Sequence, residues 1–169
     1  MSIFVGVDPG KDGAIVLMDG GGTVMAASTM PVLKGKRPEF DLEAIDDVFA
    51  AWKTGIINGM VTLEKLQPLP PAMGGSIANF NRGVSCGFEW MCVAHGLPHL
   101  LVSPRIWQKE MLAGTPGDDT KQRSIMAAQR LFPGVDLKRT SKCKGPHDGI
   151  CDALLIAEYG RRIKLGRTQ

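Results

Sequence analysis

Four acidic residues stand where a folded chain could bring them to one point. Asp8 and Glu64 each directly follow a short apolar segment. Asp148 and Asp152 lie four residues apart in a stretch with a helical pattern, so they share one helix face. Asp152 precedes the apolar run 153–157, and a carboxylate at that depth is costly unless it is paired or binds a metal.

Carboxylates gathered at one point repel one another and raise one another's pKa values. Two hard divalent cations remove that penalty, and oxygen ligands select Mg²⁺ or Mn²⁺ over zinc. Two such ions can activate a water and stabilise the leaving oxygen in phosphodiester hydrolysis. The residue types therefore favour a two-metal nuclease site, provided that the fold brings the four acids together.

Each acid also has a simpler interpretation. Asp8 opens an Asp-Pro-Gly turn, where it can accept a backbone hydrogen bond. Glu64 could form an ion pair with Lys65, and Asp148 could cap its helix. Position alone leaves these alternatives open, so the elements that carry the acids must decide between them.

Five apolar segments have the length and composition of strands. The segments 2–7, 13–18 and 23–29 are joined by glycine turns, which predicts a three-stranded antiparallel meander. The segments 59–63 and 98–102 are each followed or preceded by helical patterns, as in strand–helix units.

Apolar residues recur at helical spacing in five other segments. Asp41 caps the first, whose apolar positions are Leu42, Ile45, Val48, Phe49 and Trp52. The other predicted helices cover 76–95, 104–112, 120–132 and about 148–163. Together these elements predict an α/β domain over 1–169, with a five-stranded mixed sheet covered by helices on both faces.

Basic residues concentrate in the C-terminal part of the chain. Residues 1–100 carry 7 Lys and Arg against 10 Asp and Glu, whereas residues 101–169 carry 13 against 7. A basic half suits a polyanionic partner such as DNA. The segments 31–38 and 138–145 are predicted to be basic loops, and 67–75 is predicted to be a flexible loop.

The sequence contains no run of 18 apolar residues and no recognisable secretory leader, which predicts a cytosolic protein that does not enter a membrane. The four cysteines form no CxxC motif, so they are expected to be reduced thiols.

Three motifs together resemble the RuvC family of Holliday-junction resolvases, and bacteriophage members most of all. They are Val5-Gly-Val-Asp8-Pro-Gly before a meander, Leu63-Glu64 at a strand end, and His147-Asp-Gly-Ile-Cys-Asp152-Ala-Leu-Leu. The resemblance implies a ribonuclease H-like fold, a homodimer, and two-metal cleavage of four-way DNA junctions with Mg²⁺ or Mn²⁺. It also implies the cytoplasm of a bacterium or of a phage-infected host.

Carried over by position, Asp8, Glu64 and Asp152 match the family's acidic residues, and Lys121 resembles a lysine near the scissile phosphate. The family's fourth ligand falls at Gly149, so Asp148 is expected to substitute for it. The family aromatic three residues after the strand-end glutamate is absent here, where Gln67 stands, and Phe80 could replace it. The candidate phosphate contacts are Arg82, Arg105, Lys109, Lys121, Arg123, Lys138, Arg139, Lys142 and Lys144.

The predicted helix 76–95 resembles the family's dimer-forming segment, although packing against the sheet would explain its small residues equally well. Three other functions compete with junction resolution. A RuvC-like nuclease could act on flap DNA or structured RNA, or the fold could bind nucleic acid without cleaving it. An actin-like or sugar-kinase domain would need a second phosphate-binding hairpin, for which 169 residues leave little room.

Overall fold

The computed structural model describes residues 2–36, 38–53, 58–66 and 75–166, without the side chains of 75–82. The predicted loop 67–75 therefore lies almost wholly outside the described residues. The main sheet contains β1 (Ile3–Asp8), β2 (Ala14–Asp19), β3 (Val24–Thr29), β6 (Met60–Glu64) and β7 (His99–Val102). The helices are α1 (Leu42–Lys53), α2 (Gly75–Ala94), α3 (Pro104–Met111), α4 (Thr120–Leu131) and α5 (Asp148–Lys164).

The strand order in the sheet is β3-β2-β1-β6-β7. β1 pairs antiparallel with β2 and parallel with β6, and β7 continues the sheet parallel to β6. The predicted mixed sheet, with three antiparallel strands followed by parallel ones, is confirmed.

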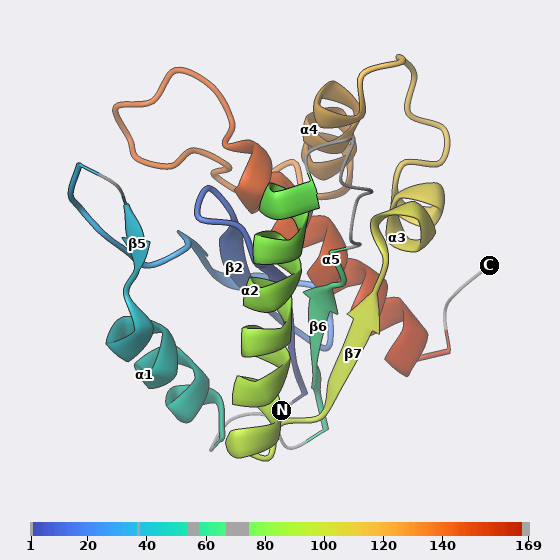
Figure 1. The fold of residues 1–169 in the computed structure, drawn as a ribbon. Coiled ribbons are helices and arrows are strands. Elements are labelled where there is room, and N and C mark those ends of the chain that lie inside the picture. The colour runs from blue at the N-terminus through green and yellow to red at the C-terminus, as the bar shows by residue number, and fades with distance from the viewer. Residues whose placement is uncertain (1, 37, 54–57, 67–74, 167–169) are drawn as a thin grey trace.

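Side chains alternate between the two faces of the sheet, and each face has its own core. Phe4 of β1 and Met60 of β6 belong to the core beneath α3, α4 and α5. Val5 and Val61 belong to the core beneath α1 and α2. Figure 1 shows α2 in front of the sheet and α5 behind it, so helices cover both faces as predicted.

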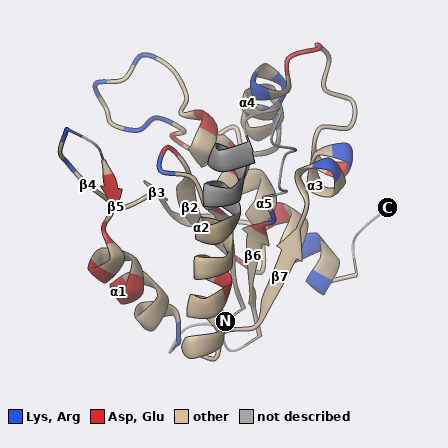
Figure 2. Ribbon diagram, viewed as in Figure 1, with Lys and Arg blue, Asp and Glu red and all other residues tan. Residues whose placement is uncertain are grey.

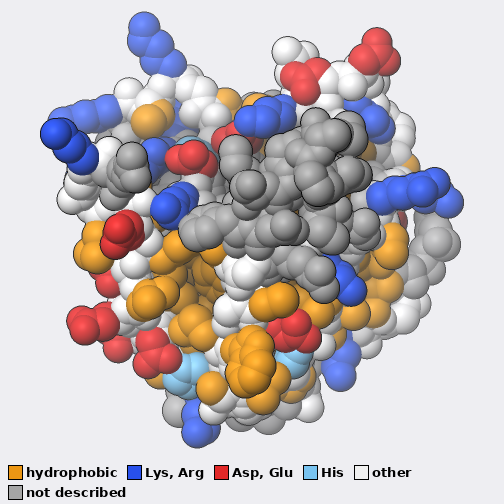
Figure 3. Space-filling view, viewed as in Figure 1, with side chains coloured by type: hydrophobic (Ala, Val, Ile, Leu, Met, Phe, Trp, Pro, Cys, Tyr) orange, Lys and Arg blue, Asp and Glu red, His pale blue; other side chains and the backbone are white. Residues whose placement is uncertain are grey.

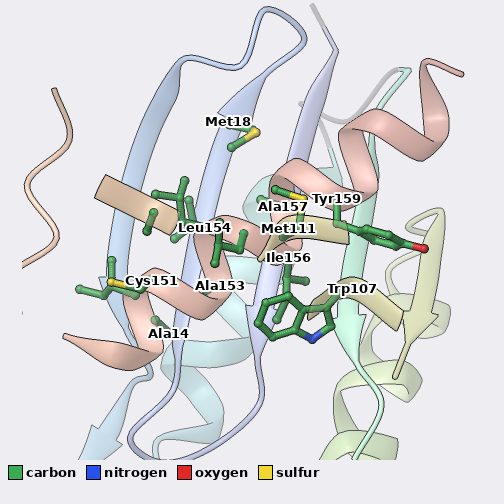
Figure 4. Packing of buried hydrophobic residues seen from close by; sticks show 14 of the residues in the cluster. Ala14, Met18, Trp107, Met111, Cys151, Ala153, Leu154, Ile156, Ala157 and Tyr159 are labelled. Carbon is green, nitrogen blue, oxygen red and sulfur yellow. The ribbon is translucent and has the colours of Figure 1, made fainter. Parts of the chain in front are cut away.

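α5 lies directly against the central strands because glycines remove the side chains between them. A Cβ atom at Gly6 of β1 would overlap the backbone of α5 at Ala153 and Ala157, and one at Gly160 would overlap the Thr62 side chain of β6. The buried α5 residues Leu154 and Ile156 share the core with Trp107 and Met111 of α3 (Figure 4). This close approach fixes the depth of the N-terminal turns of α5 relative to the ends of β1 and β6.

The segment 31–38 is not simply a loop, which corrects the prediction. It enters a small hairpin in which β4 (Val32–Leu33) pairs with β5 (Glu39–Phe40). A two-residue ladder leaves no hydrophobic period for a sequence pattern to detect. Phe40 anchors the hairpin through an edge-to-face contact with Phe88 of α2, with ring centroids 6.2 Å apart. No helix in the described part of the chain is long and apolar enough to cross a membrane.

Candidate active site

Asp8 and Glu64 occupy equivalent positions on neighbouring strands. The parallel register of β1 and β6 pairs Val7 with Leu63, so Asp8 and Glu64 come next in register, roughly 5 Å apart at their backbones. Alternation along both strands directs the two carboxylates to the face that α5 covers, because Gly6 and Thr62, two residues earlier, face α5.

α5 supplies the other two acids from its N-terminal turns. Asp148 is its first residue and Asp152 follows one turn later, at the end of a helix that favours negative charge. The side chains of Asp8, Glu64 and Asp152 are all half-buried. The negative charge of Asp152 raises the pKa of both Asp8 and Glu64, so the three carboxylates lie within electrostatic reach of one another.

Burial is the main cause of perturbed proton affinity in this cluster. Burial, together with the charges of Glu64 and Asp152, raises the pKa of Asp8 from 3.8 to about 8. Burial likewise raises the pKa of Glu64 to about 7 and that of Asp152 to about 6. Carboxyls that hold protons near neutral pH are poised to exchange them for a cation.

Neutral donors orient the clustered acids. The indole Nε1 of the fully buried Trp107 donates to Glu64 Oε1 at 2.9 Å. A hydrogen bond from the buried Ser124 hydroxyl lowers the pKa of Asp152, and a backbone hydrogen bond from Gly10 lowers that of Asp8. These bonds offset part of the burial penalty and hold each carboxylate without neutralising it.

Asp148 differs from the other three because it has a cationic partner. Lys121 Nζ lies 2.7 Å from Asp148 Oδ2, and this hydrogen bond holds the pKa of Asp148 below its ordinary value. The same contact raises the pKa of Lys121, whose side chain is 75% exposed. Lys121 therefore lies beside one of the four acids, while its predicted contact with a phosphate stays a prediction.

The structure gives a steric reason for the glycine at position 149. A Cβ atom there would overlap the carbonyl oxygen of Asp12 and the backbone of Gly13, because α5 begins directly against the β1–β2 turn. No side chain fits at that point, so an acid can be offered only from a neighbouring helix position, as Asp148 is.

Within the described residues, no three acidic, histidine or cysteine side chains already converge as a metal shell. Glu64 Oε1 accepts a hydrogen bond from Trp107, and Asp148 Oδ2 accepts one from Lys121. Asp152 Oδ1 is buried and has no hydrogen-bond partner in the described structure. An unpartnered buried carboxylate oxygen close to other acids of raised pKa fits the needs of a hard cation.

The predicted phosphate contacts fall into three groups. Arg105 is exposed near the start of α3, and Lys109 is exposed further along it. The basic loop residues Lys138, Arg139, Lys142 and Lys144 are all exposed just before α5. Arg123 instead donates from Nε to the carbonyl of Thr115 and from Nη2 to that of Leu112, both at 3.2 Å.

Arg82, Phe80 and Gln67 lie outside what the structure describes at side-chain level. The sequence analysis did not identify Trp107 or Ser124 as partners of the acids. Trp107 is 43 positions from Glu64, and nothing in its helical spacing indicates which way its indole N–H points. Ser124 follows Lys121 by one helical turn, which was the available indication that it could face the same site.

No protein-family profile matches this sequence, and no curated protein matches it. Solved structures do match. T. thermophilus RuvC in complex with a Holliday junction substrate aligns with a TM-score of 0.56 and 15% identity, covering 100% of this chain and 99% of that chain. A second Thermus thermophilus RuvC structure aligns with a TM-score of 0.51 and 15% identity, covering 99% and 98%. The chain therefore has the RuvC-like, ribonuclease H-like fold that its motifs predicted.

Proposed function

We propose that this chain is a metal-dependent endonuclease that hydrolyses phosphodiester bonds in branched DNA, four-way junctions above all. The observation that carries the proposal is the gathering of Asp8, Glu64 and Asp152 from β1, β6 and α5, with pKa values raised to about 8, 7 and 6. A cluster that disfavours its own ionisation is stable as carboxylates only with cations bound. In this proposal residues 1–169 form one nuclease domain, which is supported by a structural alignment that covers the whole chain.

In this proposal Asp8 and Asp152 hold the metal, and Glu64 and Asp148 complete its shell. Two divalent ions, Mg²⁺ or Mn²⁺, supply an activated water and charge stabilisation at the leaving oxygen when bound. Trp107 holds the orientation of Glu64 through its hydrogen bond, and Ser124 does the same for Asp152, as the hydrogen-bonded neighbours of metal ligands would. Water adds to phosphorus as the P–O3′ bond breaks, which leaves 5′-phosphate and 3′-hydroxyl ends.

Lys121 is proposed to contact the scissile phosphate. Its ammonium group reaches Asp148 Oδ2 from an exposed position at the first turn of α4, so it borders both the acids and the solvent from which DNA arrives. If Asp148 held a cation, the Lys121 ammonium would be available to stabilise the charge that develops on the phosphoryl oxygens.

The test incubates the protein with a labelled four-way junction and with linear duplex of the same sequence, in Mg²⁺, Mn²⁺ or chelator. We expect metal-dependent cleavage of the junction and little cleavage of the duplex. Asp8→Asn and Asp152→Asn should abolish cleavage, whereas Asp47→Asn, an exposed acid on α1, should not change it. Failure to cut any branched DNA in either metal would sink the proposal, and full activity of Asp8→Asn would remove the assigned site.

Substrates added in parallel decide between the competing functions. Preferred cleavage of flap DNA or of structured RNA would keep the nuclease site and change its target. Tight DNA binding with no cleavage would identify a binding module. ATP turnover without DNA cleavage would favour the actin-like interpretation.

We further propose that the enzyme is a homodimer that pairs through α2. Gly83 and Gly87 are exposed four residues apart, and a Cβ atom at either would meet no described atom within 4 Å. Packing against the sheet therefore does not explain these glycines, each of which costs about 1 kcal/mol in a helix interior. Trp90 continues the same stripe and is 75% exposed, with Val93 at 64% (Figure 3 shows the hydrophobic side chains on this face).

A flat glycine surface beside an exposed tryptophan suits the close approach of a second helix. Sedimentation should show a dimer for the wild-type protein and a monomer for Trp90→Glu. Ile163→Glu, which alters an exposed apolar residue on α5, should remain dimeric. A dimer that survives Trp90→Glu unchanged would exclude this face.

A further inference from the structure

The β4–β5 hairpin carries an exposed basic tip that no assignment above includes. Lys34 and Lys36 lie between the two strands and are exposed, and neither forms an ion pair with any residue that the structure describes. Because these two lysines have no acidic partner among the described residues and stand at the end of a projection, their charges are available to bind an external anion. Glu39 is the acid of the described hairpin, and it lies on β5 rather than at the tip.

The β4–β5 hairpin is anchored to the turn that follows β1, the strand that ends at Asp8. Lys11, three residues after Asp8, donates from Nζ to the carbonyl of Pro38 at 2.6 Å and lies 5.7 Å above the Phe40 ring. The backbone bond from Asp41 N–H to the Pro31 carbonyl, 3.2 Å long, closes the hairpin at its base. The projection is therefore held at both its base and its side, so little ordering entropy is lost when it binds a ligand.

The basic loop before α5 ends against the same turn. A backbone bond of 2.7 Å from His147 N–H to the Leu137 carbonyl joins the two ends of that loop. Asp148 and Gly149 follow at once, and Gly149 packs on Asp12 of the β1–β2 turn. The turn that carries Lys11 and Asp12 thus connects the two basic projections, with Asp8 at its start.

Charge is segregated around these projections. Figure 2 shows Lys and Arg at the end of the β4–β5 hairpin and along the loop before α5, while α1 below them carries acidic residues. Figure 3 shows cationic side chains gathered in the same upper-left region of that view. The acids of α1, among them Glu43 and Asp47, repel a polyanion from the lower part of this face.

We propose that Lys34 and Lys36 form a phosphate-binding arm for the DNA backbone, which acts together with the loop 138–144 at the turn that begins after Asp8. The inference rests on the proposed nuclease function and extends it to residues in the acidic half of the chain. The two projections hold the backbone of one DNA arm from two sides. Lys11 is the positioning residue that keeps the hairpin in place beside Asp8.

The test measures binding without chemistry. The anisotropy of a labelled four-way junction, and of a linear duplex, is titrated with protein in chelator over a range of salt concentrations. The wild-type protein is compared with Lys34→Ala/Lys36→Ala and with a matched control, Lys53→Ala/Lys164→Ala, whose lysines are exposed at the far ends of α1 and α5. Each phosphate contact contributes about 0.9 to the slope of log affinity against log salt.

We expect the hairpin variant to lose between about one and two units of that slope and to bind about 10-fold or more weakly at 0.1 M salt. The control variant Lys53→Ala/Lys164→Ala should lose much less of the salt slope and of the affinity for DNA. Equal losses of DNA affinity in the two variants, or an unchanged salt slope in the hairpin variant, would contradict the proposal that Lys34 and Lys36 bind DNA phosphates. Single-turnover cleavage at saturating protein should be the same for the control variant and the wild type, since Lys53 and Lys164 lie at the ends of α1 and α5 away from the carboxylates. If no branched DNA is cleaved, the proposed nuclease function is wrong. The salt dependence of DNA binding would still show whether Lys34 and Lys36 contact DNA phosphates.

Discussion

Replacing Asp8 with asparagine should make the metal-free protein more stable at alkaline pH. The pKa of Asp8 is raised from 3.8 to about 8, so above pH 3.8 the unfolded chain releases a proton that the folded protein retains. The folded protein therefore loses stability as pH rises from about 4 toward 8, and it loses no more above that range. Asparagine has the same shape and no proton to release, so it removes this contribution.

The size of the effect follows from the pKa shift. Across the three units from pH 5 to pH 8, a free energy of 1.36 kcal/mol per unit gives at most about 4 kcal/mol. The Asp8 side chain is half-buried and keeps some contact with water, so about 2 kcal/mol is the expected contribution of Asp8 to the loss in the wild type. Asp8→Asn should lose about 2 kcal/mol less over the same interval.

Urea unfolding in chelator at pH 5 and pH 8 measures this difference, at one protein concentration throughout. The comparison between two pH values cancels the constant cost of burying the amide. Mg²⁺ or Mn²⁺ should restore stability to the wild type at pH 8 and have little effect on Asp8→Asn, because a ligand stabilises only the state that binds it. If both proteins lose the same stability between pH 5 and pH 8, the assignment of Asp8 to a strained carboxylate cluster is refuted.

Three other substitutions test separate parts of the site. Trp107→Phe removes the donor to Glu64 Oε1, and a hydrogen bond to a charged group contributes about 1.5–3 kcal/mol. Half-maximal cleavage should therefore require about 10-fold more metal. Trp52→Phe, in the core on the other face of the sheet, should leave the metal requirement unchanged. Gly149→Ala should lower the free energy of unfolding by about 1–3 kcal/mol, because the added Cβ would overlap the Asp12 carbonyl. Gly145→Ala, where the described structure leaves space for a Cβ, should have little effect. If the two variants are equally stable, the start of α5 can shift to accept a side chain at position 149. Lys121→Met should slow single-turnover cleavage by about 10²-fold at saturating metal, and Lys53→Met should not; an unchanged rate would remove Lys121 from the site.

Much of the fold was predictable because it depends on local periodicity. The strands β1, β2, β3, β6 and β7 and all five helices lie within a few residues of their predicted positions. The β4–β5 hairpin was missed, since each of its strands has two residues and its anchor is a tertiary contact with Lys11 and Phe88. The motifs predicted the RuvC-like fold although only 15% of aligned residues are identical.

The sequence by itself determined which acids could form a site. Asp8 and Glu64 end apolar strands, and Asp148 and Asp152 are spaced by one helical turn, so local structure alone restricted the candidates. It could not determine how strongly these acids interact, because that depends on the depth at which α5 crosses the sheet. Glycines at 6 and 160 set this depth through contacts between elements far apart in the chain.

Only the tertiary structure decided which side chains surround the acids. The indole of Trp107 and the hydroxyl of Ser124 reach them from α3 and α4, and the β1–β2 turn excludes any side chain at position 149. Local periodicity fixes the face on which a residue lies, whereas burial, pKa and hydrogen-bond partners depend on what packs against that face. The four carboxylates were therefore visible in the sequence, but the raised pKa values that suit them to a cation were not.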